Sequence, residues 1–331
     1  MRFIVYGVGA IGGTIAASLA LAGHEVVGIA RGAQLEAIRG DGLMFRTPLL
    51  AERVHFPCFG TPGDVGLRDD DVIFLTMKSQ DTHDALVALR DAGVRDQPIV
   101  CAQNGIDNER QALRLFPNVY GMTVMCPGTY VQPGEILCHG KPKRGIFDLG
   151  RYPAGIDDTA RAIAGAMQAS ELAVFLFEDI MHSKRGKLLE NQGNTVRGAL
   201  GPGVDTSEFD SLLKAEGEAV YRAMGVDWLE IGPHDPRRRG VLELGEIAGS
   251  SRAGDSLTQS LTRGTGSIET DFLNGEIVLL GRLHGVPVPV NAFFTELGAR
   301  IVREGMKPGA FSVDDLRDGL RDARVVVPSG T

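Results

Sequence analysis

The sequence predicts an α/β fold, in which an N-terminal Rossmann-like, doubly wound sheet is followed by a C-terminal all-helical domain. Three observations predict it. A turn with spaced glycines, Gly7-Val8-Gly9-Ala10-Ile11-Gly12, lies between an apolar strand and an apolar helix. Apolar runs then alternate with helical stretches as far as residue 178, and helix-length amphipathic segments follow. We therefore expect a nucleotide-binding domain over residues 1–178 and a helical substrate domain over residues 179–331.

The composition limits which classes of protein the chain can belong to. The chain has 331 residues, of which 43% are hydrophobic and 23% charged, enough for two globular domains. It has no apolar stretch of ~18 residues, so we expect no membrane segment and predict a cytoplasmic location. The net charge of −8 argues against a nucleic-acid partner. The four cysteines are scattered and indicate neither a disulfide framework nor a metal site.

Apolar runs bounded by turn residues predict the individual elements. In the first domain the expected strands are residues 3–6, 25–30, 72–77, 98–103, 119–126, 144–149 and 173–177, and the expected helices are residues 11–22, 80–92 and 107–115. In the second domain the expected helices are residues 180–198, 206–225, 241–249, 256–283 with a break, and 290–304. Because no Pro/Gly linker separates the domains, we expect the helix from residue 180 to pack on the first domain, with the substrate cleft between the two. The basic run 237–239 is interpreted as a solvated loop, and His284 as the end of a helix.

The glycine turn is typical of a dinucleotide cradle. Gly7 permits a tight turn, Gly9 lets the backbone approach a pyrophosphate, and Gly12 lets the helix lie close to the sheet. The backbone N–H groups at the start of that helix, from Val8 through Ile11, then face the phosphates. A tight strand-to-helix turn without a ligand is the alternative.

The end of the second strand predicts the form of the cofactor. An acidic residue there accepts the ribose 2′-hydroxyl of NAD, whereas an arginine accommodates the 2′-phosphate of NADP. Strand 25–30 ends without an acid and is followed by Arg31. The sequence therefore favours NADPH (NADP+), with a solvated surface arginine as the alternative reading of Arg31.

Two further strands end in polar residues. Lys78 follows strand 72–77, and Asn104 follows strand 98–103. Because ligands of doubly wound sheets bind at the carboxyl ends of the strands, we place both side chains beside the cofactor. For each residue an ordinary strand-terminating turn is the alternative.

The first helix of the second half carries a cation and two amides. If residues 180–198 form one helix, Asn191 and Asn194 lie about 40° and about −20° around its axis from Lys187. Lysine is suited to donating a proton to a developing alkoxide. We therefore predict a substrate site on this face, with a solvent-exposed polar face as the alternative.

Ser256 and Glu269 are the remaining candidates for binding substrate. Ser256 lies one helical turn before Gln259, and an N-cap is an equally good reading of it. Glu269 precedes an apolar run that would carry it into the protein, where a carboxylate needs a hydroxyl or a cation as partner.

Taken together, these blocks resemble the ketopantoate reductase family over nearly the whole chain. The motifs that carry the resemblance are the glycine turn at 7–12, Arg31, Thr76-Met-Lys78, Gln103-Asn104-Gly105, Lys187-Leu-Leu-Glu-Asn191, Ser256-x-x-Gln259, Glu269-x-Asp271-x-x-Asn274-Gly275 and His284-Gly-Val-Pro-Val-Pro. The resemblance implies NADPH-dependent reduction of a 2-oxo acid to a 2-hydroxy acid, in the best-known case 2-dehydropantoate to (R)-pantoate in pantothenate and coenzyme A synthesis.

The resemblance also implies a role for each matching residue. Lys187 would be the general acid that protonates the carbonyl oxygen, and Asn191 would orient the substrate. Ser256 would bind the substrate carboxylate, and Glu269 would accept a hydrogen bond from its distal hydroxyl. Asn104 would bridge cofactor and substrate, with Lys78 on the nicotinamide side.

Several departures from the family pattern lie on the substrate side. Arg185 stands where the family often has tryptophan, and Thr195 stands where a second asparagine is expected, with Asn194 one place early. The region 209–239 is also longer and more polar than expected. Another branched or aromatic 2-oxo acid, or an amino-acid-derived substrate of a related NAD(P)-dependent dehydrogenase, is therefore the alternative. The sequence does not decide between a monomer and a homodimer.

Overall fold

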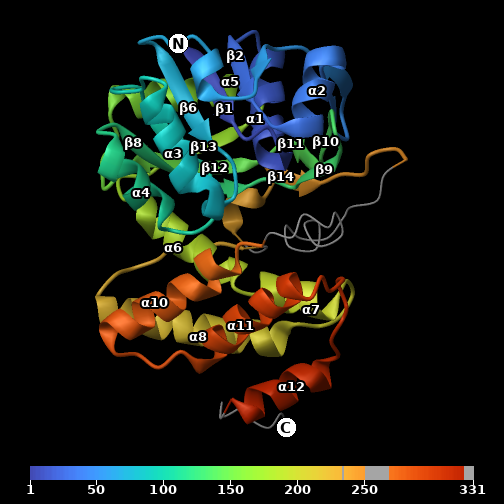
Figure 1. The fold of residues 1–331 in the computed structure, drawn as a ribbon, viewed down its shortest axis with the longest axis vertical. Coiled ribbons are helices and arrows are strands. Elements are labelled where there is room, and N and C mark those ends of the chain that lie inside the picture. Colours follow the sequence, from blue (N-terminus) through green and yellow to red (C-terminus); the bar gives the residue numbers. More distant parts are fainter. Residues whose placement is uncertain (233–234, 250–267, 324–331) are drawn as a thin grey trace. The chain divides into compact units, whose positions relative to one another are not determined.

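The computed structural model describes residues 1–232, 235–249 and 268–323 (Figure 1). The chain divides into two compact units. Unit 1 comprises Met1–Lys184 and Glu230–Arg252, and unit 2 comprises Arg185–Leu229 and Ala253–Thr331. The first break lies six residues after the predicted boundary at 178. The division predicted from the sequence did not assign the later segment Glu230–Arg252 to the first unit.

Unit 1 is built on an eight-stranded sheet. Its strands, in spatial order, are β13 (Ala173–Leu176), β12 (Ile146–Arg151), β8 (Val119–Met125), β7 (Ile99–Cys101), β6 (Asp71–Leu75), β1 (Arg2–Tyr6), β2 (Val26–Ile29) and β5 (Cys58–Phe59). Neighbouring strands are parallel except for β12 and β8, which are antiparallel. The predicted α/β fold class is confirmed, because the central strands are parallel and joined through helices.

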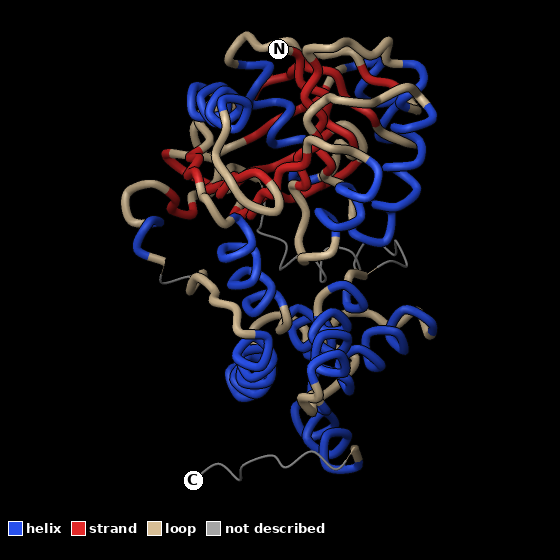
Figure 2. Tube along the Cα trace, turned by 90° about the vertical axis from the view of Figure 1, so that its left-hand side faces the viewer, coloured by secondary structure: helices blue, strands red, loops and turns tan. Residues whose placement is uncertain are grey.

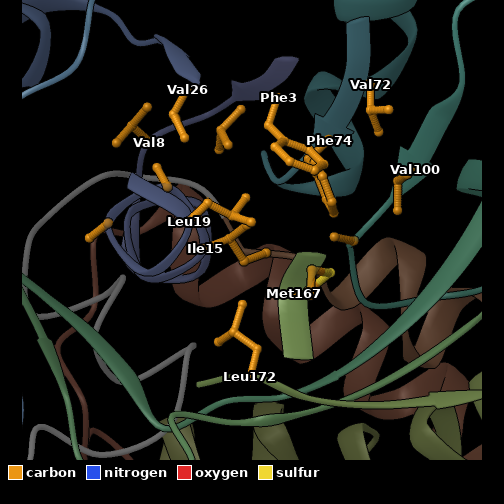
Figure 3. Close-up of a cluster of buried hydrophobic side chains, with 14 of the residues drawn as sticks. Phe3, Val8, Ile15, Leu19, Val26, Val72, Phe74, Val100, Met167 and Leu172 are labelled. Carbon is orange, nitrogen blue, oxygen red and sulfur yellow. The ribbon is translucent and has the colours of Figure 1, made fainter. Parts of the chain in front are cut away.

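Helices cover both faces of this sheet. One buried cluster joins the sheet to α1 (Ala10–Leu21) and α5 (Asp158–Ala169), and a second joins it to α3 (Thr82–Asp91) and α4 (Asn108–Leu115). Figure 3 shows the first cluster, in which Ile15 and Leu19 of α1 meet Phe3 and Phe74 from the sheet. Successive residues of β1 point to opposite faces, so Phe3 joins the first cluster and Ile4 the second.

Two smaller sheets complete unit 1. The first consists of β4 (Ala51–Val54), β3 (Leu43–Arg46), β10 (Glu135–Cys138) and β9 (Gly128–Gln132), and it packs on α1. Helix α1 is buried on both sides for this reason, and a side chain at Gly13 would meet Ile136 Cγ1 at 2.8 Å. The second pairs β11 (Gly140–Pro142) with β14 (Leu242–Leu244). Helix α2 (Gly32–Asp41), which follows β2, was not predicted.

Unit 2 is helical throughout the part that the structure describes (Figure 2). Its helices are the later residues of α6 (Ile180–Asn191), then α7 (Asn194–Leu200), α8 (Ser207–Met224), α10 (Asn274–His284), α11 (Pro289–Arg303) and α12 (Val313–Asp322). Their buried faces form one core, which includes Phe209, Leu213, Phe294 and Leu320. Helix α10 ends at His284, as predicted, because Gly285 follows in the left-handed conformation with φ 69°.

The first residues of α6, Ile180 to Lys184, belong to unit 1 and pack within it. Strand glycines make room for it: a side chain at Gly121 or Gly150 would approach Ile180 to 3.0 Å. The next polar residues are also buried there. Ser183 donates a hydrogen bond to Asp148 of β12, and Lys184 forms an ion pair with Glu109 of α4.

Three predictions about the second half are wrong. The helix expected over 180–198 is two helices, because α6 ends at Asn191 and α7 begins at Asn194. The helix expected over 241–249 is β14, a strand that completes a sheet edge in unit 1. Arg237 is no solvated loop residue: its Nη1 donates to the buried Asp148 Oδ1 at 2.6 Å, and its guanidinium lies over Phe175.

Candidate functional site

The predicted cofactor residues of unit 1 follow adjacent strands at one edge of the sheet. Register pairs Tyr6 with Ile29 on one side and with Leu75 on the other, and Leu75 with Cys101. The segments that follow these strands carry Arg31, the glycine turn, Lys78 and Asn104, in that spatial order. We call this the cofactor edge. It lies at the carboxyl ends of parallel strands, where doubly wound sheets bind their ligands.

The three glycines of the turn fit a dinucleotide. Gly7 has φ 106°, and a side chain there would approach Met77 N to 2.8 Å. A side chain at Gly12 would overlap the Gly7 carbonyl and the Thr76 hydroxyl, so α1 lies against the sheet only with glycine here. At Gly9, by contrast, the nearest atom to an added Cβ is Gly7 O at 4.0 Å. The turn therefore has its open space where a pyrophosphate must approach the backbone.

The intervening residues contribute backbone rather than side chains. Val8 is 2% exposed and belongs to the core, and its carbonyl accepts a hydrogen bond from Gln34 Nε2 at 2.8 Å. Ala10 and Ile11 form the first turn of α1, whose N–H groups have no partner within the helix. Such a helix start attracts an anion.

Arg31 occupies the N-cap position of α2 without a capping hydrogen bond from its side chain, and it is largely exposed. Its side chain is 77% exposed, and Nη2 lies 3.7 Å from Asp81 Oδ2. A solvent-screened ion pair at this distance holds the guanidinium only weakly. Arg31 is therefore able to reorient toward an anion beside the glycine turn.

A hydrogen-bond network joins the Lys78 and Asn104 turns, and sequence reasoning missed it. Ser79 Oγ and Asn108 Nδ2 donate to the Asn104 carbonyl at 3.2 and 2.9 Å. Gln103 Nε2 donates to the Met77 carbonyl at 3.0 Å and to Thr82 Oγ1 at 2.7 Å. The available signal was a run of polar residues directly after each apolar strand.

Thr76 fastens the glycine turn to the neighbouring strand. Its hydroxyl shares one proton between the carbonyls of Tyr6 and Gly7, at 3.0 and 2.8 Å. Thr76 appeared in the sequence motif, but no role was predicted for it.

In unit 2, α6 carries Lys187 and Asn191. The Lys187 side chain is 17% exposed and forms an ion pair with Glu190 on the same helix. Asn191 is 6% exposed, and its Nδ2 has no hydrogen-bond partner within the described part of the chain. The helix thus holds a partly buried cation and, one turn later, an amide donor that is not used internally.

Asn194 does not share a helical face with Lys187, because the helix breaks before it. It begins α7, and its Oδ1 accepts a hydrogen bond from Arg197 Nη2 at 2.9 Å. Thr195 is buried and bonds to Thr270 Oγ1 at 3.0 Å and to Asn274 Oδ1 at 3.2 Å.

The Thr195–Thr270 bond brings the segment of Glu269 beside the start of α7. Glu269 is half-buried and directly precedes the short helix η4 (Thr270–Phe272). Ser256 lies outside the described residues. Among the residues that the structure describes, no group of His, Cys, Asp or Glu side chains is arranged to hold a metal, and no helix is both long and apolar enough to cross a membrane.

A glycine turn at the carboxyl edge of a doubly wound sheet, with a helical second unit, is typical of the two-domain NAD(P)H-dependent oxidoreductases. Family models identify which of them this is. The model "Ketopantoate reductase PanE/ApbA" matches residues 3–153, and "Ketopantoate reductase PanE/ApbA C terminal" matches residues 203–301. The chain belongs to the ketopantoate reductase family.

Relatives and solved structures agree with this membership. The chain is 28% identical over 299 residues to a 2-dehydropantoate 2-reductase of Pyrococcus horikoshii, covering 88% of this chain and 94% of that one. It is 29% identical over 313 residues to the enzyme of the same name from Caulobacter vibrioides, covering 88% and 96%.

Among solved structures, a PanE/ApbA family ketopantoate reductase from Ralstonia eutropha superposes with a TM-score of 0.75 at 26% identity, covering 92% of this chain and 99% of that one. D-mandelate dehydrogenase with NADH and anilino(oxo)acetate has a TM-score of 0.79 at 21% identity, with the same coverage. This second likeness concerns the fold alone.

Proposed function

We propose that the protein is an NADPH-dependent 2-oxo acid reductase, and that its substrate is 2-dehydropantoate, which it reduces to (R)-pantoate. The observation that carries the proposal is the order of Arg31, glycine turn, Lys78 and Asn104 along the cofactor edge, in a chain whose two halves both match the family. The curated relatives named 2-dehydropantoate 2-reductase support the choice of substrate.

The choice of NADPH rests on Arg31. No acidic residue occupies the end of β2, where an acid would select the 2′-hydroxyl of NAD. A guanidinium holds a phosphate through two parallel hydrogen bonds and can stack on adenine. When bound, the nicotinamide supplies the hydride.

The protein's own residues would bind the acid and supply the proton. Lys187 would donate a proton to the carbonyl oxygen as negative charge develops there, which a cation stabilises more in the transition state than in the ground state. Asn191 would direct its amide to the substrate, and Ser256 would bind the carboxylate. Glu269 would accept from a distal hydroxyl, and Asn104 would contact both cofactor and substrate.

A different branched or aromatic 2-oxo acid is the second candidate substrate. Thr195 stands where the family has a second asparagine, and its hydroxyl forms hydrogen bonds with Thr270 and Asn274 inside unit 2. One amide of the family pattern is therefore replaced by a hydroxyl whose hydrogen bonds are made within the protein. A pocket changed in this way could accept a larger side chain on the acid.

The test is NADPH consumption, followed by absorbance, with 2-dehydropantoate and a panel of bulkier 2-oxo acids. We expect kcat/KM for 2-dehydropantoate to exceed that for each other acid by at least tenfold. A higher kcat/KM for a branched or aromatic acid would transfer the proposal to that substrate. The absence of oxidation with every acid would contradict a reductase function.

The same assay, run with NADPH and with NADH, tests the cofactor. We expect the wild type to prefer NADPH, and Arg31→Ala to lose most of that preference through a higher KM for NADPH. Arg53→Ala, which removes another exposed arginine of unit 1, is the matched control and should leave the preference unchanged. An unchanged preference in Arg31→Ala would show that the phosphate is recognised elsewhere.

A further inference from the structure

A buried ion pair lies directly behind the cofactor edge. The Lys184 side chain, from the first half of α6, is 2% exposed, and its partner Glu109 near the start of α4 is 0% exposed. Figure 1 shows α4 next to the beginning of α6. Burial raises the pKa of Glu109, and the Lys184 ammonium opposes that rise. Neither residue has a role in the function proposed above.

The Lys184 amine makes a second contact, and this one reaches the cofactor edge. Nζ donates to the Gln103 carbonyl at 3.0 Å. That carbonyl belongs to the peptide plane shared with Asn104 N. The next peptide plane is held as well, because the Asn104 carbonyl accepts from Ser79 and Asn108. With both flanking planes fixed, the direction of the Asn104 Cα–Cβ bond, from which the side chain extends, is fixed too.

The hydrogen bonding of the Lys184–Glu109 pair is incomplete for a pair that serves only to stabilise the fold. Glu109 Oε2 is buried and has no hydrogen-bond partner within the described residues. A buried ion pair that leaves an oxygen unsatisfied recovers its desolvation cost poorly. A second buried pair of unit 1, which lies in the sheet, differs: Arg2 donates to both Asp71 oxygens at 2.6 and 2.8 Å, and Arg68 N adds a third bond at 2.6 Å.

We propose that Lys184 and Glu109 are positioning residues, which hold the Gln103–Asn104 peptide so that Asn104 presents its amide to cofactor and substrate. Glu109 holds the Lys184 ammonium in place inside the protein, and Lys184 in turn holds the Gln103 carbonyl just after the end of β7. The proposal rests on the function proposed for the cofactor edge.

The experiment measures the NADPH dissociation constant by fluorescence titration, together with Tm, for Lys184→Met. We expect the Kd for NADPH to rise about tenfold. In Asn104→Ala, which already lacks the amide, adding Lys184→Met should raise Kd by less than twofold. This non-additivity separates action through Asn104 from general destabilisation.

Arg2→Met is the matched control, because Arg2 and Asp71 begin β1 and β6 at the opposite edge of the sheet. It should lower Tm and leave Kd within twofold of wild type. Glu109→Gln is the second variant should Lys184→Met fail to fold, with an expected rise in Kd of about threefold.

An unchanged Kd in folded Lys184→Met or Glu109→Gln would overturn the positioning role while leaving the proposed function intact. Additive effects of Lys184→Met and Asn104→Ala would overturn it too. Wild-type protein that does not bind NADPH would instead contradict the proposed function, and the positioning role with it.

Discussion

Gly9 and Gly12 lie three residues apart in one turn, yet the structure gives them different constraints. At Gly12 a side chain would overlap the protein's own backbone, whereas at Gly9 the nearest described atom to an added Cβ is Gly7 O, at 4.0 Å. Gly12 is thus required by the packing of α1 on the sheet. Among the described residues Gly9 has no such requirement, and a glycine here is what the proposed approach of a pyrophosphate to the backbone needs.

Gly9→Ala should therefore separate binding from folding. We expect the Kd for NADPH to rise at least tenfold, because the new methyl group occupies the space of the pyrophosphate, while Tm falls by only a few degrees. Isothermal titration and thermal unfolding are the two measurements. Gly165→Ala, at an exposed position of α5 where an added Cβ meets no described atom within 4 Å, is the control: it should leave Kd unchanged and raise Tm slightly, because alanine is the better helix former.

Residue-level reasoning from the sequence worked best where local geometry decides. Gly7 and Gly12 follow from the strand–turn–helix pattern, and the structure shows that a side chain at either position would meet backbone atoms. Arg31, Lys78 and Asn104 were predicted as site residues from their positions after strands, and they stay predictions. The bonds from Thr76 to the glycine turn and from Lys184 to Gln103 join segments 69 and 81 residues apart. No local pattern predicts such pairings, since they depend on the completed fold.

The sequence placed β14 and the turn before it in the helical domain, but both belong to unit 1. The segment returns from the helical part of the sequence to unit 1, where Leu242 is buried and β14 pairs with β11. Arg237 reaches Asp148 of β12 at 2.6 Å and is also bound by Asp235. Burial raises the pKa of Asp148, and the guanidinium opposes this rise. Arg237 therefore fastens the segment to the sheet.

Arg237→Met should release this segment, because it leaves Asp148 buried without its cation. Loss of one partner of a buried pair lowers the free energy of unfolding by about 3 kcal/mol. We expect that decrease in urea unfolding, and faster hydrogen exchange over residues 241–245. Arg239→Met removes an exposed arginine of the same run and should change the free energy by less than about 0.5 kcal/mol. Equal stability of the two variants would refute the role given to Arg237.

The central strands were predicted within a few residues, since buried parallel strands are continuous apolar runs. Both errors concern segments whose conformation depends on contacts with residues distant in the sequence. The Leu-Glu-Leu run of β14 is too short to separate a strand from a helix by periodicity, and it becomes a strand by pairing with β11. The 180–198 helix breaks at Gln192 and Gly193, and at this break a side chain at Gly193 would overlap Asp210, a contact that periodicity does not reveal.

At the scale of the whole molecule, the chain is two units joined through a helix that begins in one and continues in the other. Unit 1 carries the cofactor edge, and unit 2 carries Lys187, Asn191 and Glu269. The predicted boundary at residue 178 likewise places Lys187, Asn191 and Glu269 in the second half of the chain. The sequence did not predict that Glu230–Arg252 belongs to unit 1, since that depends on pairing with β11.

The central claim is that the Lys187 ammonium protonates the carbonyl oxygen of a 2-oxo acid. The most direct test is single-turnover and steady-state kinetics of Lys187→Ala with saturating NADPH and 2-dehydropantoate. The matched control is Lys214→Ala, which removes a helical lysine that also pairs with a glutamate of its own helix. We expect kcat of Lys187→Ala to fall several hundredfold, within the roughly 10²–10⁴ that general acid catalysis contributes, with an unchanged Kd for NADPH. Turnover within a few-fold of wild type would contradict the account.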